Sequence, residues 1–117
     1  MNTPQLPPGY RAKFRHDRVT RWAHPGRLGA HQVLNERGGT TTCMLFDPSK
    51  VLIAETTAHA RHDDYDKNGV LVKGEAYSKK LGRTISLGRA IHTLSDPTND
   101  DPRAVAFREA LKELSNR

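Results

Sequence analysis

The sequence has little cysteine, few aromatic residues and no long hydrophobic run, and each shortage excludes a class of protein. Cys43 is the only cysteine, which excludes an internal disulfide and a zinc site built on several cysteines, and suits a reducing compartment. No apolar run approaches the ~20 residues that a membrane span needs, and the start, MNTPQLPPG, lacks the basic and apolar regions of a signal peptide. We therefore expect a cytoplasmic protein without a membrane partner.

The length and composition indicate one small domain. The chain has 117 residues, of which 35% are hydrophobic and 6% aromatic, enough for a single domain with a modest core. Prolines and a glycine are concentrated before residue 10. We predict that residues 1–9 form a flexible Pro-rich arm and that residues 10–117 form a single α+β domain.

The positive charge is concentrated near the N-terminus. The chain carries 19 Lys and Arg against 13 Asp and Glu, a net charge of +6, and residues 11–27 hold six of these cations against one acid, Asp17. The segment therefore carries +5 of the total. A basic segment on a nearly neutral body is typical of a protein that binds a phosphate backbone or another acidic surface.

Within this segment, cations alternate with apolar residues. An extended strand would place Arg11, Lys13 and Arg15 on one face and the apolar residues between them on the other. Trp22 follows in the same segment and could stack on a base, anchor a protein contact or fill the core.

The strongest strand signal is a hairpin between residues 40 and 59. TTTCMLF and VLIAETTAH are rich in β-branched and apolar residues, and the DPSK between them is typical of a turn. Ser78 is a typical N-cap for a helix that extends to about Leu94, and Asp101 followed by Pro102 begins a second helix. The predicted fold class is α+β: a small antiparallel sheet, with this hairpin at its centre, packs against two C-terminal helices.

The first of these helices is predicted to be amphipathic. A helical wheel places Leu81 and Ile85 on the face expected to pack on the core. The opposite face, expected to form a basic outer edge, carries Lys79, Arg83, Ser86 and Ala90. Gly82 and Gly88 each cost the helix about 1 kcal/mol relative to Ala, which indicates that something packs closely against its backbone there.

Three segments between residues 38 and 91 resemble a family of small bacteriophage proteins of unassigned function. They are GGTTTCMLFD, VLIAETTAHA and YSKKLGRTISLGRAI. In that family, a Gly-Gly-x-Thr hairpin precedes a helix with a Gly-Arg…Gly-Arg-Ala pattern. Residues 61–75 depart from the family, since a loop and a short strand are inserted there. The resemblance implies a phage or prophage origin but no activity.

A second resemblance concerns residues 74–83, GEAYSKKLGR. They are similar to the last strand and the start of the last helix of a double-stranded-RNA-binding domain, where basic residues face phosphates across a groove. The resemblance assigns this role to Lys79, Lys80 and Arg83, and it implies a first helix over residues 28–36. Independently of this resemblance, cations at the start of a helix add to the positive end of the helix dipole, and together they favour the binding of an anion.

A polar segment after the hairpin raises the question of metal binding. Its candidate ligands are His59, His62, Asp63, Asp64 and Asp66, and Cys43 could reach His59 across the hairpin. However, the spacing matches no zinc finger, the chain has no P-loop, Rossmann glycine motif or nucleophile elbow, and such residues are common in plain turns. We expect no catalytic residues, no metal and no cofactor.

Two functional hypotheses remain. The chain could be a small basic nucleic-acid-binding protein that contacts the phosphate backbone of DNA or RNA with little sequence specificity. Alternatively, it could be a phage-encoded, non-enzymatic protein that binds and inhibits an acidic host protein, such as a defence or transcription component. A homodimer is possible because a small sheet has exposed edge strands. The candidate nucleic-acid-binding residues are Arg11, Lys13, Arg15, Arg18, Arg21, Trp22, Lys79, Lys80 and Arg83.

Overall fold

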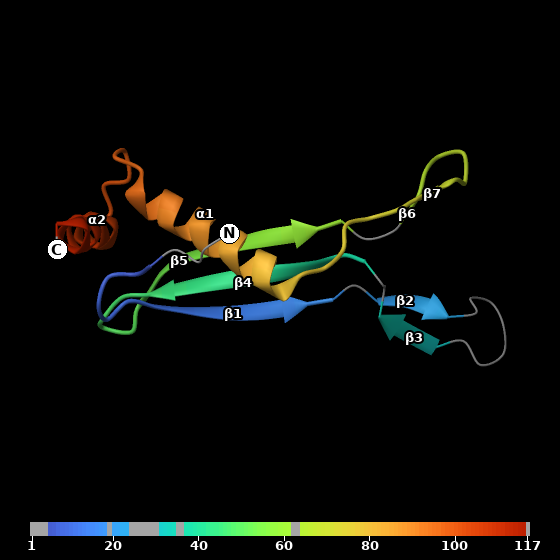
Figure 1. Ribbon diagram of the computed structural model, residues 1–117, viewed down its shortest axis with the longest axis horizontal. Helices are drawn as coiled ribbons and strands as arrows, with labels where there is room; N and C mark the ends of the chain where they lie inside the picture. The colour runs from blue at the N-terminus through green and yellow to red at the C-terminus, as the bar shows by residue number, and fades with distance from the viewer. Residues whose placement is uncertain (1–4, 19, 24–30, 35–36, 62–63, 117) are drawn as a thin grey trace.

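The protein is an α+β domain in which two C-terminal helices follow a three-stranded antiparallel sheet. The computed structural model describes residues 5–18, 20–23, 31–34, 37–61 and 64–116. The sheet has the order β1-β4-β5, with β1 at Arg11–Asp17, β4 at Gly39–Phe46 and β5 at Leu52–Ala60. Helix α1 (Lys79–Ser95) crosses one face of this sheet, and α2 (Pro102–Ser115) lies beside the end of α1 (Figure 1). The predicted fold class is confirmed.

Two short hairpins extend beyond the sheet at one end. Strand β2 (Thr20–Ala23) pairs with β3 (His31–Leu34), and β6 (Asp64–Tyr65) pairs with β7 (Leu71–Val72). Both lie beyond the end of β1 and of the first turn of α1, so the molecule measures 60 × 27 × 25 Å (Figure 1). β3 is a strand at a place where the double-stranded-RNA-binding resemblance implies a helix. No helix among the described residues is long and apolar enough to cross a membrane.

The predicted hairpin is confirmed to within one residue at each end. Strands β4 and β5 pair antiparallel, with one register shift between Leu45 and Phe46. The turn between them is held by the Asp47 carboxylate, which accepts hydrogen bonds from the backbone N–H groups of Ser49 and Val51, each at 2.9 Å. A short acceptor side chain at the first turn position is the usual way to hold such a turn.

Alternation along the strands separates a helix-facing side of the sheet from an open side. On β4, Cys43 and Leu45 are fully buried and belong to the core beneath the helices. Phe14 of β1 pairs with Cys43 and packs against the same core, whereas its neighbours Lys13 and Arg15 are exposed. Because side chains alternate between the two faces of a strand, the cations of β1 lie on the open side, as predicted.

The hydrophobic core joins the sheet to both helices. Phe107 of α2 is fully buried and packs edge to face against Tyr10, with ring centroids 5.2 Å apart. Leu6 packs on this core and Pro7 is buried; both belong to the segment for which the sequence predicts a flexible arm. The buried core residues are Cys43, Leu45, Leu87, Ala90, Leu94, Ala104 and Phe107.

The predicted orientation of α1 is wrong, because the helix turns the opposite face to the sheet. Ser86 and Ala90 are completely buried, whereas Leu81 is 45% exposed. Ser86 tolerates burial because its hydroxyl donates to the Gly82 carbonyl 2.7 Å away inside the helix. Small side chains here let the helix approach the sheet, and Leu87 then supplies the apolar contact.

The predicted helix starts are confirmed. Ser78 is the N-cap of α1, and its hydroxyl accepts a hydrogen bond from the Leu81 N–H at 3.1 Å. Asp101 caps α2, with Pro102 in the first turn. The end of α1 is tied to α2 by Arg108, whose guanidinium donates to the carbonyls of Leu94 and Asp96, each at 3.0 Å. These bonds fix where α1 begins and ends, and so which of its residues reach β1.

Candidate functional site

The open side of β1 carries a row of three exposed cations. Arg11, Lys13 and Arg15 lie at alternate positions of the strand. Arg15 forms an ion pair with Asp17, with Nε and Oδ2 3.0 Å apart, and both side chains are more than half exposed. The ammonium group of Lys13 lies 5.6 Å from the centre of the Phe46 ring on the neighbouring strand. The row therefore remains accessible to an anion in solvent.

Lys79 and Arg83 lie on the other side of β1. They occupy the same stripe of α1 as the buried Ala90 and Leu87, one and two turns closer to the N-terminus. Their charges act on His16 of β1, whose pKa is lowered by partial desolvation, then by Lys79 and Arg83, while Asp17 opposes the shift. Arg83 is half-buried and Lys79 exposed. Two basic segments separated by more than sixty residues thus meet at the β1 edge of the sheet.

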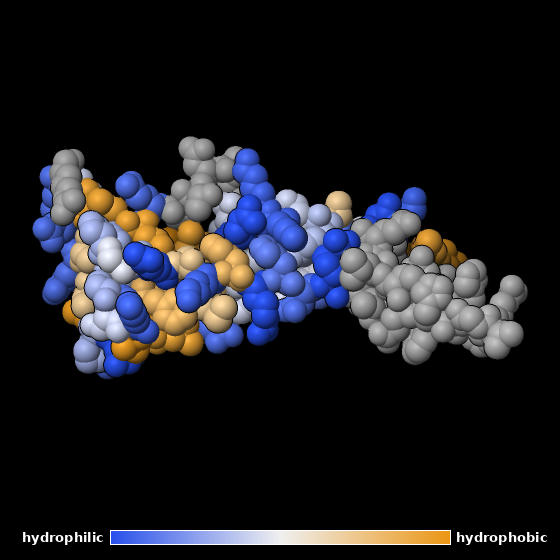
Figure 2. Space-filling model, turned by 90° about the horizontal axis from the view of Figure 1, so that it is seen from below, coloured by the Kyte–Doolittle hydropathy of each residue, from blue (hydrophilic) through white to orange (hydrophobic). Residues whose placement is uncertain are grey.

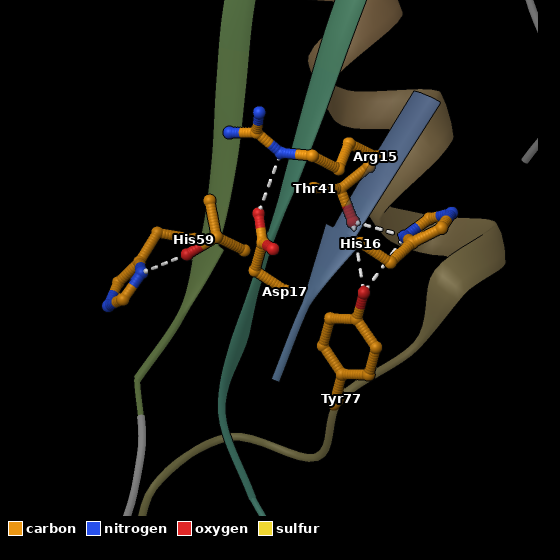
Figure 3. A network of polar contacts seen from close by, with 7 residues as sticks. Arg15, His16, Asp17, Thr41, His59 and Tyr77 are labelled. Atoms are coloured by element: carbon orange, nitrogen blue, oxygen red, sulfur yellow. Dashed lines mark hydrogen bonds and ion pairs between the residues drawn. The ribbon is translucent and has the colours of Figure 1, made fainter. Parts of the chain in front are cut away.

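His16 links this edge to the segment that precedes α1. Its Nδ1 lies 2.8 Å from the Tyr77 hydroxyl and 3.0 Å from the Thr41 hydroxyl. Figure 3 shows this cluster of three residues, with the Arg15–Asp17 pair apart from it. The Arg18 guanidinium carbon lies 4.7 Å from the centre of the Tyr77 ring, within the range of a cation–π contact. The network holds the start of α1, and with it Lys79, against β1.

The remaining predicted residues do not all join this edge. Lys80 is exposed and lines a shallow hollow with Ser78, Leu81 and Thr84. Arg21 and Trp22 belong to β2, where the structure describes the backbone pairing with β3 and not the side chains. Because Lys80 lies three residues before Arg83, the two are neighbours on the surface of α1, and the assignment of Lys80 to one cluster with Lys79 and Arg83 stays a prediction.

Seen from the edge that β1 forms, the charge and the apolar surface separate. Hydrophilic side chains gather in the middle of this face, over the second half of β1 and the start of α1, and hydrophobic ones gather towards α2 (Figure 2). Within the described part of the chain, five of the predicted cations form no ion pair with a carboxylate: Arg11, Lys13, Lys79, Lys80 and Arg83. Their charge is not neutralised internally.

A groove on the open side adds residues that the sequence analysis missed. It has a volume of about 530 Å³ and is lined in part by Arg11, Lys13, Phe46, Pro48 and Lys50. Alternation along β4 is a sequence signal that places Phe46 on the open side, because Leu45 faces the core. The approach of Lys50 to β1 depends on the turn, in which this residue adopts a φ of 67°.

A second groove lies on the helix side of β1. It has a volume of about 540 Å³, its floor is largely apolar, with Tyr10, Ala12 and Phe14 of the N-terminal segment, and Arg11 and Arg83 line it as well. α1 packs mainly on β4 and β5 and makes few contacts with β1, which leaves this side of β1 partly uncovered. β1 is thus an edge strand with an apolar hollow beside it.

The candidate metal ligands are not brought together among the described residues. Cys43 is fully buried and faces the core, where burial raises the pKa of its thiol to about 11. His59 pairs with Thr40 on the open side, and its Nδ1 lies 3.2 Å from the Thr40 hydroxyl. The proposed reach of Cys43 to His59 is therefore wrong, because strand alternation places them on opposite faces. No group of three or more ligating side chains occurs in the described ranges; His62, Asp63 and the Asp64 side chain lie outside them.

Comparison of the chain with family models, with curated proteins and with solved structures gives no match. The likeness to small bacteriophage proteins and to double-stranded-RNA-binding domains stays a prediction from the sequence.

Proposed function

We propose that the protein binds nucleic acid through the β1 edge, contacting phosphates with little sequence specificity. The observation that carries this proposal is the contact of α1 with β1, where Arg83 lines one groove together with Arg11, which combines two basic segments that are distant in the sequence. Together with the three exposed cations of β1, Lys79 and Arg83 place cations on both sides of one strand. A sugar–phosphate backbone presents regularly spaced negative charges, which such a band complements.

The composition of this edge supports contacts to phosphate over the reading of bases. Its charged groups are long side chains of Lys and Arg, most of them exposed, which can follow a backbone without fixing a base-specific pattern. Affinity from such contacts falls steeply with salt because each contact releases a counterion.

The test compares two double variants that lose the same charge. Lys79→Gln/Arg83→Gln removes the contribution of α1 to the edge, whereas Arg103→Gln/Lys112→Gln removes two exposed cations of α2. Fluorescence anisotropy is measured with labelled single-stranded DNA, duplex DNA and duplex RNA at two salt concentrations. The first variant should lower the magnitude of the salt slope by about 1.5–2, and the second should leave it unchanged.

An equal effect of both variants would mean that net charge alone attracts nucleic acid and would contradict a defined interface. Absence of binding by the unmodified protein at low salt would contradict the proposed function itself. Circular dichroism of each variant verifies that the fold is retained.

The helix-side groove favours a second candidate function. In this alternative, the protein is phage-encoded and binds and inhibits an acidic host protein without enzymatic activity. A partner strand added to β1 would cover Ala12 and Phe14, which α1 leaves half-exposed. A pulldown from nuclease-treated host lysate separates the two candidates. A partner that persists after nuclease treatment supports this function, and one that disappears supports nucleic-acid binding.

A further inference from the structure

The groove on the open side of the sheet joins an aromatic ring to a cluster of cations. Phe46 is half-buried at the end of β4, and Arg11, Lys13 and Lys50 are exposed around it. None of these three cations forms an ion pair within the described residues. Neither α1 nor α2 covers this side, since their buried positions belong to the core on the other side. The ring therefore lies in a cationic groove open to solvent.

The groove is built by the turn and by the segment before β1. Gly9 has a φ of +86°, and a Cβ on it would lie 3.0 Å from Cγ of Pro48. This close approach brings the start of β1 against the hairpin turn. The Asp47 carboxylate also lines the groove, but its Oδ1 is engaged by two backbone N–H groups of the turn. The groove is therefore lined by three cations and one acid.

We propose that this groove seats one unpaired base of a single-stranded nucleic acid, with the base stacked on Phe46 and the flanking phosphates on Arg11, Lys13 and Lys50. The inference rests on the proposed function and adds the form of nucleic acid. Base–aromatic stacking works with any base because each has a π-face, which agrees with binding of low sequence specificity. The groove has a volume of about 530 Å³, which lies within the range of about 300–1,000 Å³ that small-molecule sites occupy.

The position of Lys13 supports this occupant over a duplex. Its ammonium group lies over the Phe46 ring, 5.6 Å from the ring centre, so a base that stacks on this face displaces the ammonium, which stays within reach of the flanking phosphate. A duplex keeps its bases stacked on one another and offers their faces only at its ends. An acidic peptide without aromatic residues complements the charge but has no flat ring to place on Phe46.

The experiment measures the affinity of the full chain for a 15-nucleotide oligo-dT and for a 15-base-pair duplex. Phe46→Leu keeps an apolar side chain but removes the ring. It should weaken single-strand binding about 5- to 100-fold, leave the salt slope unchanged and leave duplex binding within about twofold. Phe46→Tyr keeps the ring and should retain single-strand affinity.

Photo-cross-linking of the unmodified protein gives a readout that does not depend on a variant that folds. An oligonucleotide containing 5-iodouracil should attach to the tryptic peptide of residues 38–50, in which Phe46 is the only aromatic residue. Attachment to another peptide, or unchanged single-strand binding by folded Phe46→Leu, would overturn the inference while nucleic-acid binding stands. Binding of an acidic peptide but of no oligonucleotide would overturn the inference together with the proposed function.

Discussion

At the scale of single residues, small contacts decide where the cations of α1 point. A Cβ added to Gly82 would lie 2.2 Å from the Thr41 hydroxyl oxygen and 2.9 Å from the Thr41 Cβ. Only a glycine lets α1 approach β4 this closely. The sequence analysis expects close packing at both Gly82 and Gly88, and the structure confirms it at Gly82 alone, since nothing lies within 4 Å of an added Cβ at Gly88.

The two glycines provide a matched pair of substitutions. Gly82→Ala should destabilise the protein by about 1–3 kcal/mol, because overpacking against the buried Thr41 outweighs the gain in helix propensity. Gly88→Ala should stabilise it by up to about 1 kcal/mol, because only the propensity gain remains. Urea denaturation followed by circular dichroism measures both. Stabilisation by both substitutions would contradict the close packing of α1 on β4.

His16 makes stability depend on pH in a defined direction. Its pKa in the folded protein is lowered from the usual 6.5, first by desolvation and then by Lys79 and Arg83. The unfolded chain therefore binds more protons below about pH 6.5, and stability falls as the pH decreases from there. His16→Asn should flatten this part of the profile. His92→Asn, which replaces an exposed histidine outside the network, is the control, and equal profiles for the two variants would contradict the assignment to His16.

At the scale of elements, local patterns predict where strands and helices lie but not how they dock. The alternation of β1, the hairpin turn at Asp47 and the caps at Ser78 and Asp101 are all readable because each depends on neighbouring residues. The face of α1 that packs on the sheet is not readable in this way. Leu81 and Ile85 satisfy a helical wheel, but the buried stripe uses Ser86 and Ala90, whose small size permits contact with β4 and β5.

The same limit applies to the candidate site. Arg11, Lys13 and Arg15 share a face, as the strand alternation predicts. The meeting of Lys79 with His16 depends on how α1 crosses the sheet, and the approach of Lys50 to Phe46 depends on the register shift after Leu45. The first brings together distant segments and the second depends on the backbone geometry of the hairpin turn, and the alternation along a strand encodes neither.

The N-cap of α1 tests whether the start of this helix is held as described. Ser78→Ala removes the hydroxyl that accepts from the Leu81 N–H and should lower the free energy of unfolding by about 1 kcal/mol. Ser78→Asp restores an acceptor and should recover most of the loss. Ser115→Ala, in the last turn of α2, should change stability by less than about 0.5 kcal/mol. A Ser78→Ala protein as stable as the unmodified one would contradict this capping role.

At the scale of the whole molecule, the structure is elongated and its charge is asymmetric. The radius of gyration over Cα atoms is 18.8 Å, whereas a compact chain of this length has about 13 Å. The two hairpins beyond the sheet account for the length (Figure 1). Small-angle X-ray scattering of the monomer should give a radius of gyration of about 19 Å. A radius of gyration near 14 Å would show that the hairpins fold back on the sheet.

The charge of β1 bears on the predicted homodimer. An antiparallel pair of β1 strands centred on Phe14 would place Lys13 of one copy opposite Arg15 of the other. Like charges opposite each other destabilise a strand pair, and cations on an edge strand are a common device against self-pairing. A homodimer stays a prediction, and this strand favours an anionic partner over a second copy.

The central claim is that cations from β1 and α1 form one interface for nucleic acid, and the most direct test is the salt dependence of single-strand affinity. Five contacts, from Arg11, Lys13, Arg15, Lys79 and Arg83, contribute about −3.5 to the slope of log affinity against log salt, and replacement of all five by Gln should leave only about −0.7, the contribution of Lys50. An undiminished slope after this replacement in a folded protein, or no binding by the unmodified protein at low salt, would contradict the account.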